Sequence, residues 1–455
     1  MSGMFDFGRD LRRAFAGRAG VPLRDGLTGG DVTLLDLLDL GMLKAEARGA
    51  AIAAGRVSAP DPARAALAAA RVWRELARRT GDPMTLRRAA AFAESAAAKA
   101  EGGRRRELQH EAELDQAACA GLGVELFGDD GLEPAIGFIL RRVAETSGRP
   151  ALLAQLGLAA LAGRRALGDG DLDAALASAA AFEAPLAALR PLARRDGVAR
   201  LAAVEHRMAL ADLLAACGAR LKDDRLLTCA LTELAAAGRD LSPDHEPLAA
   251  ARLGLRRGEI LTLSGEMTGD AGAIADGVER LTQAIGDIDR DHSPLDWARA
   301  QIALGQALQA MGEATDSPRA FDQALACFDR AELLLRREPA LALRALAANA
   351  RSVCLGRLAE ATGDIAVLDA AEAALRTELT AGFTGRDALA WAVTQLGLAR
   401  LYELRVEVTG RGQERLPDAA MAYDEALTVF AERGLRAYSD LAARGLERLR
   451  ERAAG

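Results

Sequence analysis

The chain has 455 residues, of which 50% are hydrophobic and only 4% aromatic, and its formal net charge is -7. This charge is opposite in sign to the basic surface that non-specific nucleic-acid binding requires, so nucleic acid is excluded as a default partner. The five cysteines are widely spaced in apolar runs, which indicates small buried side chains in a reducing, cytoplasmic compartment. No stretch is expected to span a membrane, since the most apolar segment, residues 151–163, is too short.

Residues 1–20 predict an amphipathic helical segment. Met4, Phe7, Leu11 and Phe15 fall on one helical stripe, with arginines around them. A basic amphipathic helix can dock into the groove of a partner or make weak contact with a membrane surface. Because chain termini often fold back on their own domain or fray, those outcomes stay open as well.

The remaining chain divides into three parts. Residues 21–58 are interpreted as a Gly-rich linker followed by a helix that caps the next segment, because a terminal repeat must cover its open face. Residues 59–433 are interpreted as a helical repeat array, and residues 434–455 as a charged C-terminal capping helix.

A recurring turn measures the repeat. Thr-Gly-Asp occurs at residues 80–82, 268–270 and 362–364, and the separations of 188 and 94 residues equal 4 × 47 and 2 × 47. A period of 47 predicts further turns beginning at 127, 174, 221, 315 and 409. Four of these five places carry part of the motif, whereas at 174 it fails and a Gly-Asp-Gly-Asp turn stands six residues earlier, at 168–171. The array should therefore contain eight repeats.

Each turn has a physical interpretation as the corner of a helical hairpin. Glycine accepts the left-handed conformation that ends a helix, and the following aspartate caps the next helix. The second helix of each hairpin then shows large residues six and thirteen positions after the start of the turn and small residues nine positions after it. Examples at these three positions are Ile274, Leu281 and Gly277 in one repeat and Phe321, Phe328 and Ala324 in the next. This spacing predicts close packing between helices.

The segment FDQALACFDRA, residues 321–331, resembles the second helix of a tetratricopeptide repeat, and LPDAAMAYDEA, residues 416–426, resembles it less closely. The period departs from the family, at 47 instead of 34 residues, so each helix must be longer; HEAT-type repeats, which have nearly this length, are the structural runner-up. The resemblance implies an all-α fold, a right-handed α-solenoid of about eight helical hairpins.

In tetratricopeptide arrays the first helices line a concave groove, so polar residues that recur on first helices are candidates for partner binding. Arg252 and Arg299 both stand 16 residues before their turns, and Arg256 and Asn349 lie one helical turn further along that face. A second set, Gln301 and Gln395, stands 14 residues before the turns of their repeats. Residues two apart point to different sides of a helix, so at most one set lines the groove, and the first set is favoured. Arg252 and Arg256 could hold a carboxylate of an extended peptide.

No catalytic, metal or cofactor site is predicted. The histidines have no partner in a nucleophile motif, and His245 and His292, at matching repeat positions, are interpreted as polar caps of loops in preference to metal ligands.

We therefore expect a non-enzymatic scaffold or adaptor that binds a protein or peptide segment in the groove. The alternatives are a regulatory sensor solenoid that binds a small ligand, which would show a closed pocket with convergent polar groups, and a membrane-peripheral assembly factor that uses the N-terminal amphipathic helix. The Ala-rich faces also permit a homo-oligomer.

Overall fold

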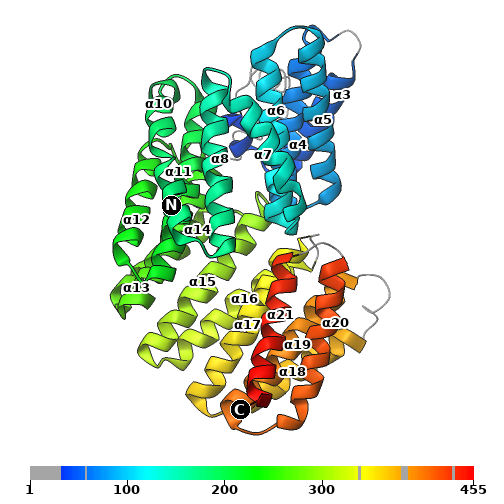
Figure 1. Cartoon of the computed structure of the whole chain (residues 1–455). Helices are drawn as coiled ribbons and strands as arrows, with labels where there is room; N and C mark the ends of the chain where they lie inside the picture. The colour runs from blue at the N-terminus through cyan, green and yellow to red at the C-terminus, as the bar shows by residue number, and fades with distance from the viewer. Residues whose placement is uncertain (1–31, 57–58, 337–339, 381–387, 433–435, 455) are drawn as a thin grey trace.

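The computed structural model describes residues 32–56, 59–336, 340–380, 388–432 and 436–454, and these residues form helices joined by short turns (Figure 1). The amphipathic stripe of Met4, Phe7, Leu11 and Phe15 lies outside the described residues.

The described part of the chain contains eight helical hairpins. The first helices are α4 (Pro62–Thr80), α6 (Arg106–Phe127), α8 (Arg149–Asp169), α11 (Gly197–Leu221), α13 (Pro247–Thr268), α15 (Pro294–Thr315), α17 (Leu341–Thr362) and α19 (Ala388–Thr409). The second helices are α5 (Pro83–Gly102), α7 (Glu133–Ala144), the pair α9 (Leu172–Ala180) and α10 (Glu183–Ala193), α12 (Asp224–Arg239), α14 (Ala271–Asp287), α16 (Pro318–Leu335), α18 (Ala366–Thr380) and α20 (Leu416–Glu432). The short helices η1 (Thr33–Leu37), η2 (Asp130–Leu132) and η4 (Gln413–Arg415) precede α3 (Leu40–Gly55), α7 and α20, and α21 (Arg436–Ala454) follows α20.

Each first helix ends in a residue of left-handed conformation, as the repeated turn predicts. These residues are Gly81, Gly128, Gly170, Lys222, Gly269, Asp316, Gly363 and Gly410. In the turns that begin at 80, 268 and 362, the aspartate that follows accepts a hydrogen bond from a backbone N–H at the start of the second helix. The third turn falls early, at Gly170, and its hairpin compensates with two short helices, α9 and α10, in place of one.

The small residue of each second helix permits close contact inside the hairpin. A Cβ atom added to Gly277 on α14 would stand 2.4 Å from Thr262 Oγ1 and 3.0 Å from the carbonyl oxygen of Gly258, both on α13. The large residues on either side, Ile274 and Leu281, are fully or nearly fully buried. The lengthened period is accommodated by long helices, since α13, α15, α17 and α19 have 22 residues each.

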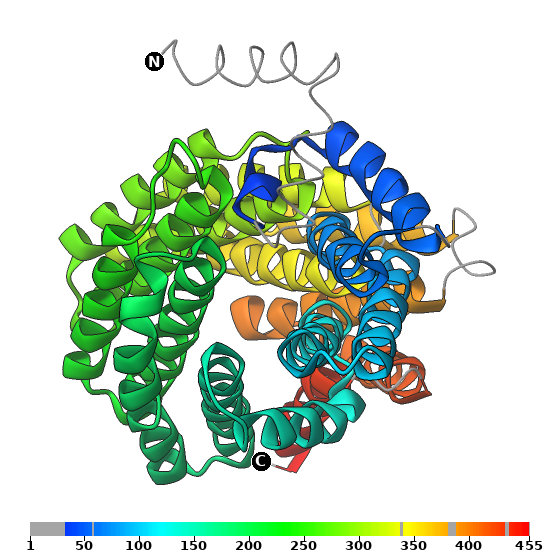
Figure 2. The same ribbon diagram turned by 90° about the horizontal axis from the view of Figure 1, so that it is seen from above.

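The hairpins form a right-handed superhelix. Seen from above, the chain runs clockwise from α4 through α11 to α15, and it descends along the same axis, which fixes the hand (Figures 1 and 2). The prediction of an all-α, right-handed solenoid of tetratricopeptide-like hairpins is therefore confirmed for the described residues.

The superhelix closes on itself after about one turn. Helix α15 contacts α4, and α17 contacts α6. Leu295 and Ile302 of α15 belong to the same hydrophobic cluster as Leu67 and Trp73 of α4. Gly81 sits at this junction, where an added Cβ would stand 3.0 Å from Leu295 Cδ1. The sixth and seventh hairpins thus pack against the first and second.

Two statements from the sequence are corrected: residues 151–163 are not the segment that comes nearest to a membrane span, and one of the five cysteines is not buried. The segment Leu172–Ala193 has the length and apolar composition to cross a membrane. In the fold it is broken between α9 and α10, and its Phe182 and Leu189 are fully buried in a cluster shared with α8 and α11. Cys229 is exposed, unlike the other cysteines, because it precedes by one residue the small position, Ala230, that faces the hairpin partner.

Candidate functional site

The first helices form the inner layer of the superhelix. Each contacts the first helix of the next hairpin, in the pairs α4 with α6, α6 with α8, α8 with α11, α11 with α13, α13 with α15 and α15 with α17. In a curved stack, the layer whose neighbours touch directly is the one on the inside of the curve. The inner face runs from α4 of the first hairpin to α15 of the sixth. It is therefore the surface on which polar residues from distant repeats can meet.

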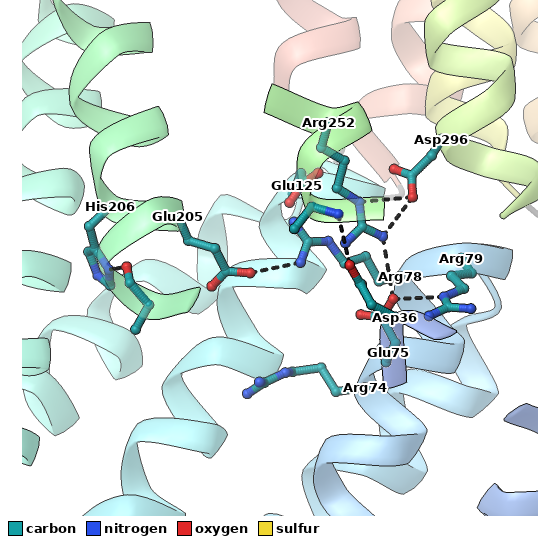
Figure 3. Close-up of polar contacts among 12 residues, drawn as sticks. Asp36, Arg74, Glu75, Arg78, Arg79, Glu125, Glu205, His206, Arg252 and Asp296 are labelled. Atoms are coloured by element: carbon teal, nitrogen blue, oxygen red, sulfur yellow. Dashed lines mark hydrogen bonds and ion pairs between the residues drawn. The ribbon is translucent and has the colours of Figure 1, made fainter. Parts of the chain in front are cut away.

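Arg252 stands at the centre of a polar cluster on this inner face (Figure 3). Its Nε and Nη2 donate to Asp296 Oδ2 at 2.9 and 2.6 Å, and Nη2 also lies 3.4 Å from Glu75 Oε1. Burial would raise the pKa of Asp296, but Arg252 outweighs it and holds that pKa well below its usual range. One guanidinium thus connects α13 with α15 and with α4 of the first hairpin.

Glu75 is the acceptor that the first hairpin contributes. It accepts a hydrogen bond from Arg79 Nε at 2.7 Å as well as facing Arg252. Burial would raise the pKa of Glu75, but Arg252 and Arg79 together lower it to about 2. The carboxylate is therefore charged throughout the physiological range and is paired with arginines inside the fold.

Two further ion pairs cross the inner face between hairpins that are distant in sequence. Arg78 Nη1 of α4 donates to Glu205 of α11 at 2.9 Å, as Figure 3 shows. Arg299 Nη2 of α15 lies 2.8 Å from Glu125 of α6. The carboxylates of these pairs keep 57% and 48% of their side-chain surface exposed, respectively, so they face solvent as well as their arginines.

Asp212 on α11 is the least compensated carboxylate of the group. Its nearest cation, Arg256, lies 3.4 Å away through Nε, while Arg256 Nη1 makes a shorter contact of 2.8 Å with Glu259. Partial burial between the helices, together with Glu259 and Glu125, outweighs Arg256 and raises the pKa of Asp212 to about 6. This side chain is 44% exposed and would gain from a further positive charge.

The structure places the candidate residues from the sequence in four environments. Arg252, Arg256 and Arg299 lie on the inner face but are already paired with carboxylates, so the expected carboxylate-binding role has no free guanidinium pair to perform it. Gln301 is 4% exposed and its Oε1 has no hydrogen-bond partner. Gln395 Nε2 donates to Glu425 at 2.5 Å. Asn349 is half-buried on α17 in the seventh hairpin.

Sequence reasoning missed every acidic member of this surface. Glu205 stands 16 residues before its turn at 221, the same position that Arg252 and Arg299 occupy in their repeats. Counting carboxylates together with basic residues at this position would have found Glu205. Glu75 and Asp212 stand at other positions of their repeats, and the closure of the superhelix brings Glu75 to the face that Arg252 occupies.

The interpretation of His292 as a polar loop cap is incomplete. Burial, with Arg79 nearby, lowers the pKa of His292 to about 4, so the ring is neutral at physiological pH. Its Nε2 is buried and has no hydrogen-bond partner. No group of histidine, cysteine, aspartate and glutamate side chains among the described residues has the arrangement of a metal site.

Two clefts lie away from the inner-face cluster. One of about 510 Å³ is lined by residues of α8, α10 and the loop to α11, including Arg149 and Arg195. The other, of about 320 Å³, is lined by the turns of the seventh and eighth hairpins, including Gly363 and Arg411. Arg149, on the first cleft, is paired with Glu111 and Asp196.

No protein-family model matches the chain, and no curated protein matches its sequence. Among solved structures, a Rap protein in complex with competence and sporulation factor is similar at 12% identity and a TM-score of 0.45, over 86% of this chain and 99% of that one. A signal-transduction ATPase with a tetratricopeptide repeat sensor, from Pyrococcus horikoshii, is similar at 12% identity and a TM-score of 0.40, over 85% and 56%. The nuclear import adaptor Nro1 is similar at 13% identity and a TM-score of 0.30, over 70% and 95%.

Proposed function

We propose that this protein is a non-enzymatic interaction scaffold that binds an extended segment of a partner protein on the inner face of its superhelix. The observation that carries the proposal is the convergence of half-exposed charged side chains from α4, α6, α11 and α13 on that face. Charged groups that a fold requires only for stability are usually placed where they are fully solvated or fully paired. Here several carboxylates are held between helices with part of their surface still open to a ligand.

The charge of this face predicts the chemistry of the partner. Arg252, which sequence reasoning assigned to a carboxylate, is 12% exposed and enclosed by Asp296 and Glu75. The more open groups are the carboxylates of Glu205, Glu125 and Asp212. A segment with lysine or arginine side chains would meet acceptors that are already held in place, so little of the binding energy would be lost in ordering them.

The experiment that tests this function is selection from a phage-displayed library of random 12-residue peptides against the full-length protein. Enriched peptides would be synthesised, and their affinities measured by fluorescence anisotropy at fixed salt. We expect enrichment of basic peptides whose affinity falls about two- to fivefold in Asp212→Asn, because an ion pair of a half-exposed carboxylate contributes up to about 1 kcal/mol.

The matched control is Asp276→Asn, which removes an exposed carboxylate from the second helix α14. Equal losses of affinity in the two variants would mean that the peptides respond only to the net charge of -7. Failure to enrich any peptide that depends on Asp212 would refute binding on the inner face.

A further inference from the structure

The short helix η1 lies where the two ends of the superhelical turn meet. It contacts α11 and α13. Leu35 within it and Leu38 just after it are 5% and 1% exposed, and both belong to the hydrophobic cluster that joins α4 to α15. Residues 32–38 therefore fill the junction between the first hairpin and the fourth to sixth hairpins.

The backbone of this segment is fastened to the first hairpin by one arginine. Arg79 of α4 is completely buried, and its Nη1 and Nη2 donate to the carbonyl oxygens of Leu38 and Leu35 at 2.5 and 2.7 Å. Its Nε is held by Glu75, the same carboxylate that faces Arg252 of α13. The segment and the ion pairs of the inner face thus share one buried arginine.

The segment is fastened to the fifth hairpin by Asp36. Asp36 Oδ2 accepts a hydrogen bond from the backbone N–H of Ala249, in the first turn of α13, at 2.9 Å. An aspartate normally caps the helix that follows it directly, by accepting from the second or third helical N–H. The residue in that place, Glu246, makes no such bond; its side chain instead accepts from Ser242 N and pairs with Arg200. Asp36 therefore caps a helix 213 residues away in sequence.

The surroundings of Asp36 show that this contact connects several hairpins. Arg252, Glu75, Arg79 and His292 all face it. Each of these belongs to a helix or loop of the first, fifth or sixth hairpin, as Figure 3 shows for the first three. Loss of the contact at Asp36 would leave an uncapped N–H on α13 and remove a carboxylate from the group that surrounds Arg252.

We propose that residues 32–38 act as a strap that holds the superhelix closed, and that release of this strap separates the first hairpin from α13 and α15 and opens the inner face. The second clause rests on the proposed function, because it concerns access of a partner to that face. The strap itself is a property of the fold and can be tested without any ligand.

The test measures the distance between the first and sixth hairpins by pulsed electron paramagnetic resonance on the full chain. Spin labels would be placed at Glu94→Cys on α5 and Gln323→Cys on α16, both exposed, with Cys229→Ser removing the exposed native thiol. Asp36→Ala should shift the distance distribution to longer values, with the open population rising several-fold.

The matched control is Asp82→Ala. Asp82 also caps a helix, accepting from Met84 N at 2.9 Å, but it caps its own hairpin. Loss of a cap there should leave the distance distribution unchanged. If Asp36→Ala does not fold by circular dichroism, Asp36→Asn, which keeps an acceptor oxygen, should show a smaller shift in the same direction. An unchanged distribution in the folded Asp36 variant would overturn the strap.

A second measurement separates the strap from the proposed function. The association rate of an enriched 12-residue peptide should rise several-fold in Asp36→Ala and stay unchanged in Asp82→Ala. A longer distance without a faster association would retain the strap but overturn its role in access to the inner face. A faster association with an unchanged distance would contradict the strap and leave binding on the inner face intact.

Discussion

Arg78 of the first hairpin donates to Glu205 of the fourth across 127 residues of sequence. The contact exists because the inner layer curves through a full turn, so that α4 and α11 face each other across it. Arg78 and Glu205 are 27% and 57% exposed at their side chains, which places the pair between a surface ion pair and a buried one.

The first prediction concerns the strength of this pair. Arg78→Met and Glu205→Gln should each lower stability by less than about 1 kcal/mol, and the double variant should show a coupling energy of about 0.2–1 kcal/mol, because exposed ion pairs contribute little. Urea unfolding of the four proteins measures the coupling. A coupling near zero would contradict a stabilising contribution of this pair.

The second prediction concerns the close contact inside the fifth hairpin. Gly277→Ala should destabilise the protein by about 1–3 kcal/mol, since the new methyl group meets the Thr262 hydroxyl and the backbone of Gly258. Gly286 lies on the same helix with no atom within 4 Å of an added Cβ, so Gly286→Ala should stabilise by about 0.5–1 kcal/mol. Thermal unfolding of the two variants would contradict this account if their effects had the same sign.

Gly277 and the glycines of the turns illustrate how much of the fold the sequence could predict. The period of 47 residues placed the left-handed residue of every turn except Gly170, because each turn needs the same local chemistry. The small position at Gly277 followed from helical spacing alone. The third hairpin could not be predicted from the period, since its two short helices depend on how Phe182 and Leu189 pack against α8 and α11.

The inner face was predictable only in part. Arg252 and Arg299 were found because they recur at one position of the repeat. Their acidic partners on other hairpins, such as Glu75 and Glu125, do not recur in that way. Which of them meet depends on small rotations between successive hairpins, and these sum over the superhelix to a curvature that periodicity does not encode.

The third prediction concerns acid stability at the C-terminal end. Glu403 is fully buried, and Arg448 donates to both its oxygens, at 2.7 and 2.9 Å. Burial would raise the pKa of Glu403, but Arg448 and Arg400 lower it to about 2, from 4.5. A carboxylate with a lowered pKa in the fold stabilises it above pH 4.5, and this contribution is lost as the pH falls toward 2.

Glu403→Gln should therefore remove part of this pH dependence. Between pH 4.5 and 2, the protection of α21 amides against hydrogen exchange, measured relative to the intrinsic rate at each pH, should fall in the wild-type protein, and in the variant this protection should already be lower at pH 5. The control is Glu447→Gln, which removes an exposed carboxylate from α21 itself. This variant should leave the exchange of α21 unchanged. Equal exchange in the two variants at pH 5 would argue against a stabilising role for Glu403.

The fourth prediction concerns the pH dependence of binding on the inner face. The pKa of Asp212 is raised from 3.8 to about 6, by burial and by Glu259 and Glu125 against the opposing effect of Arg256. Asp212 therefore gains its negative charge as the pH rises through 6. A basic peptide should bind more tightly at pH 7 than at pH 5, because the carboxylate that attracts it is ionised only at the higher pH.

The same shift has the opposite sign for stability. Between pH 3.8 and 6 the folded protein holds a proton on Asp212 that the unfolded chain has lost, so the contribution of Asp212 to stability declines as the pH rises through this window. Asp212→Asn should remove both effects, leaving peptide affinity nearly constant from pH 5 to 7. Glu205 does not share this behaviour, because Arg78 outweighs burial and lowers its pKa. If Asp212→Asn retained the full rise in affinity, the titrating group would lie elsewhere, and Asp212 would not be the carboxylate that meets the peptide.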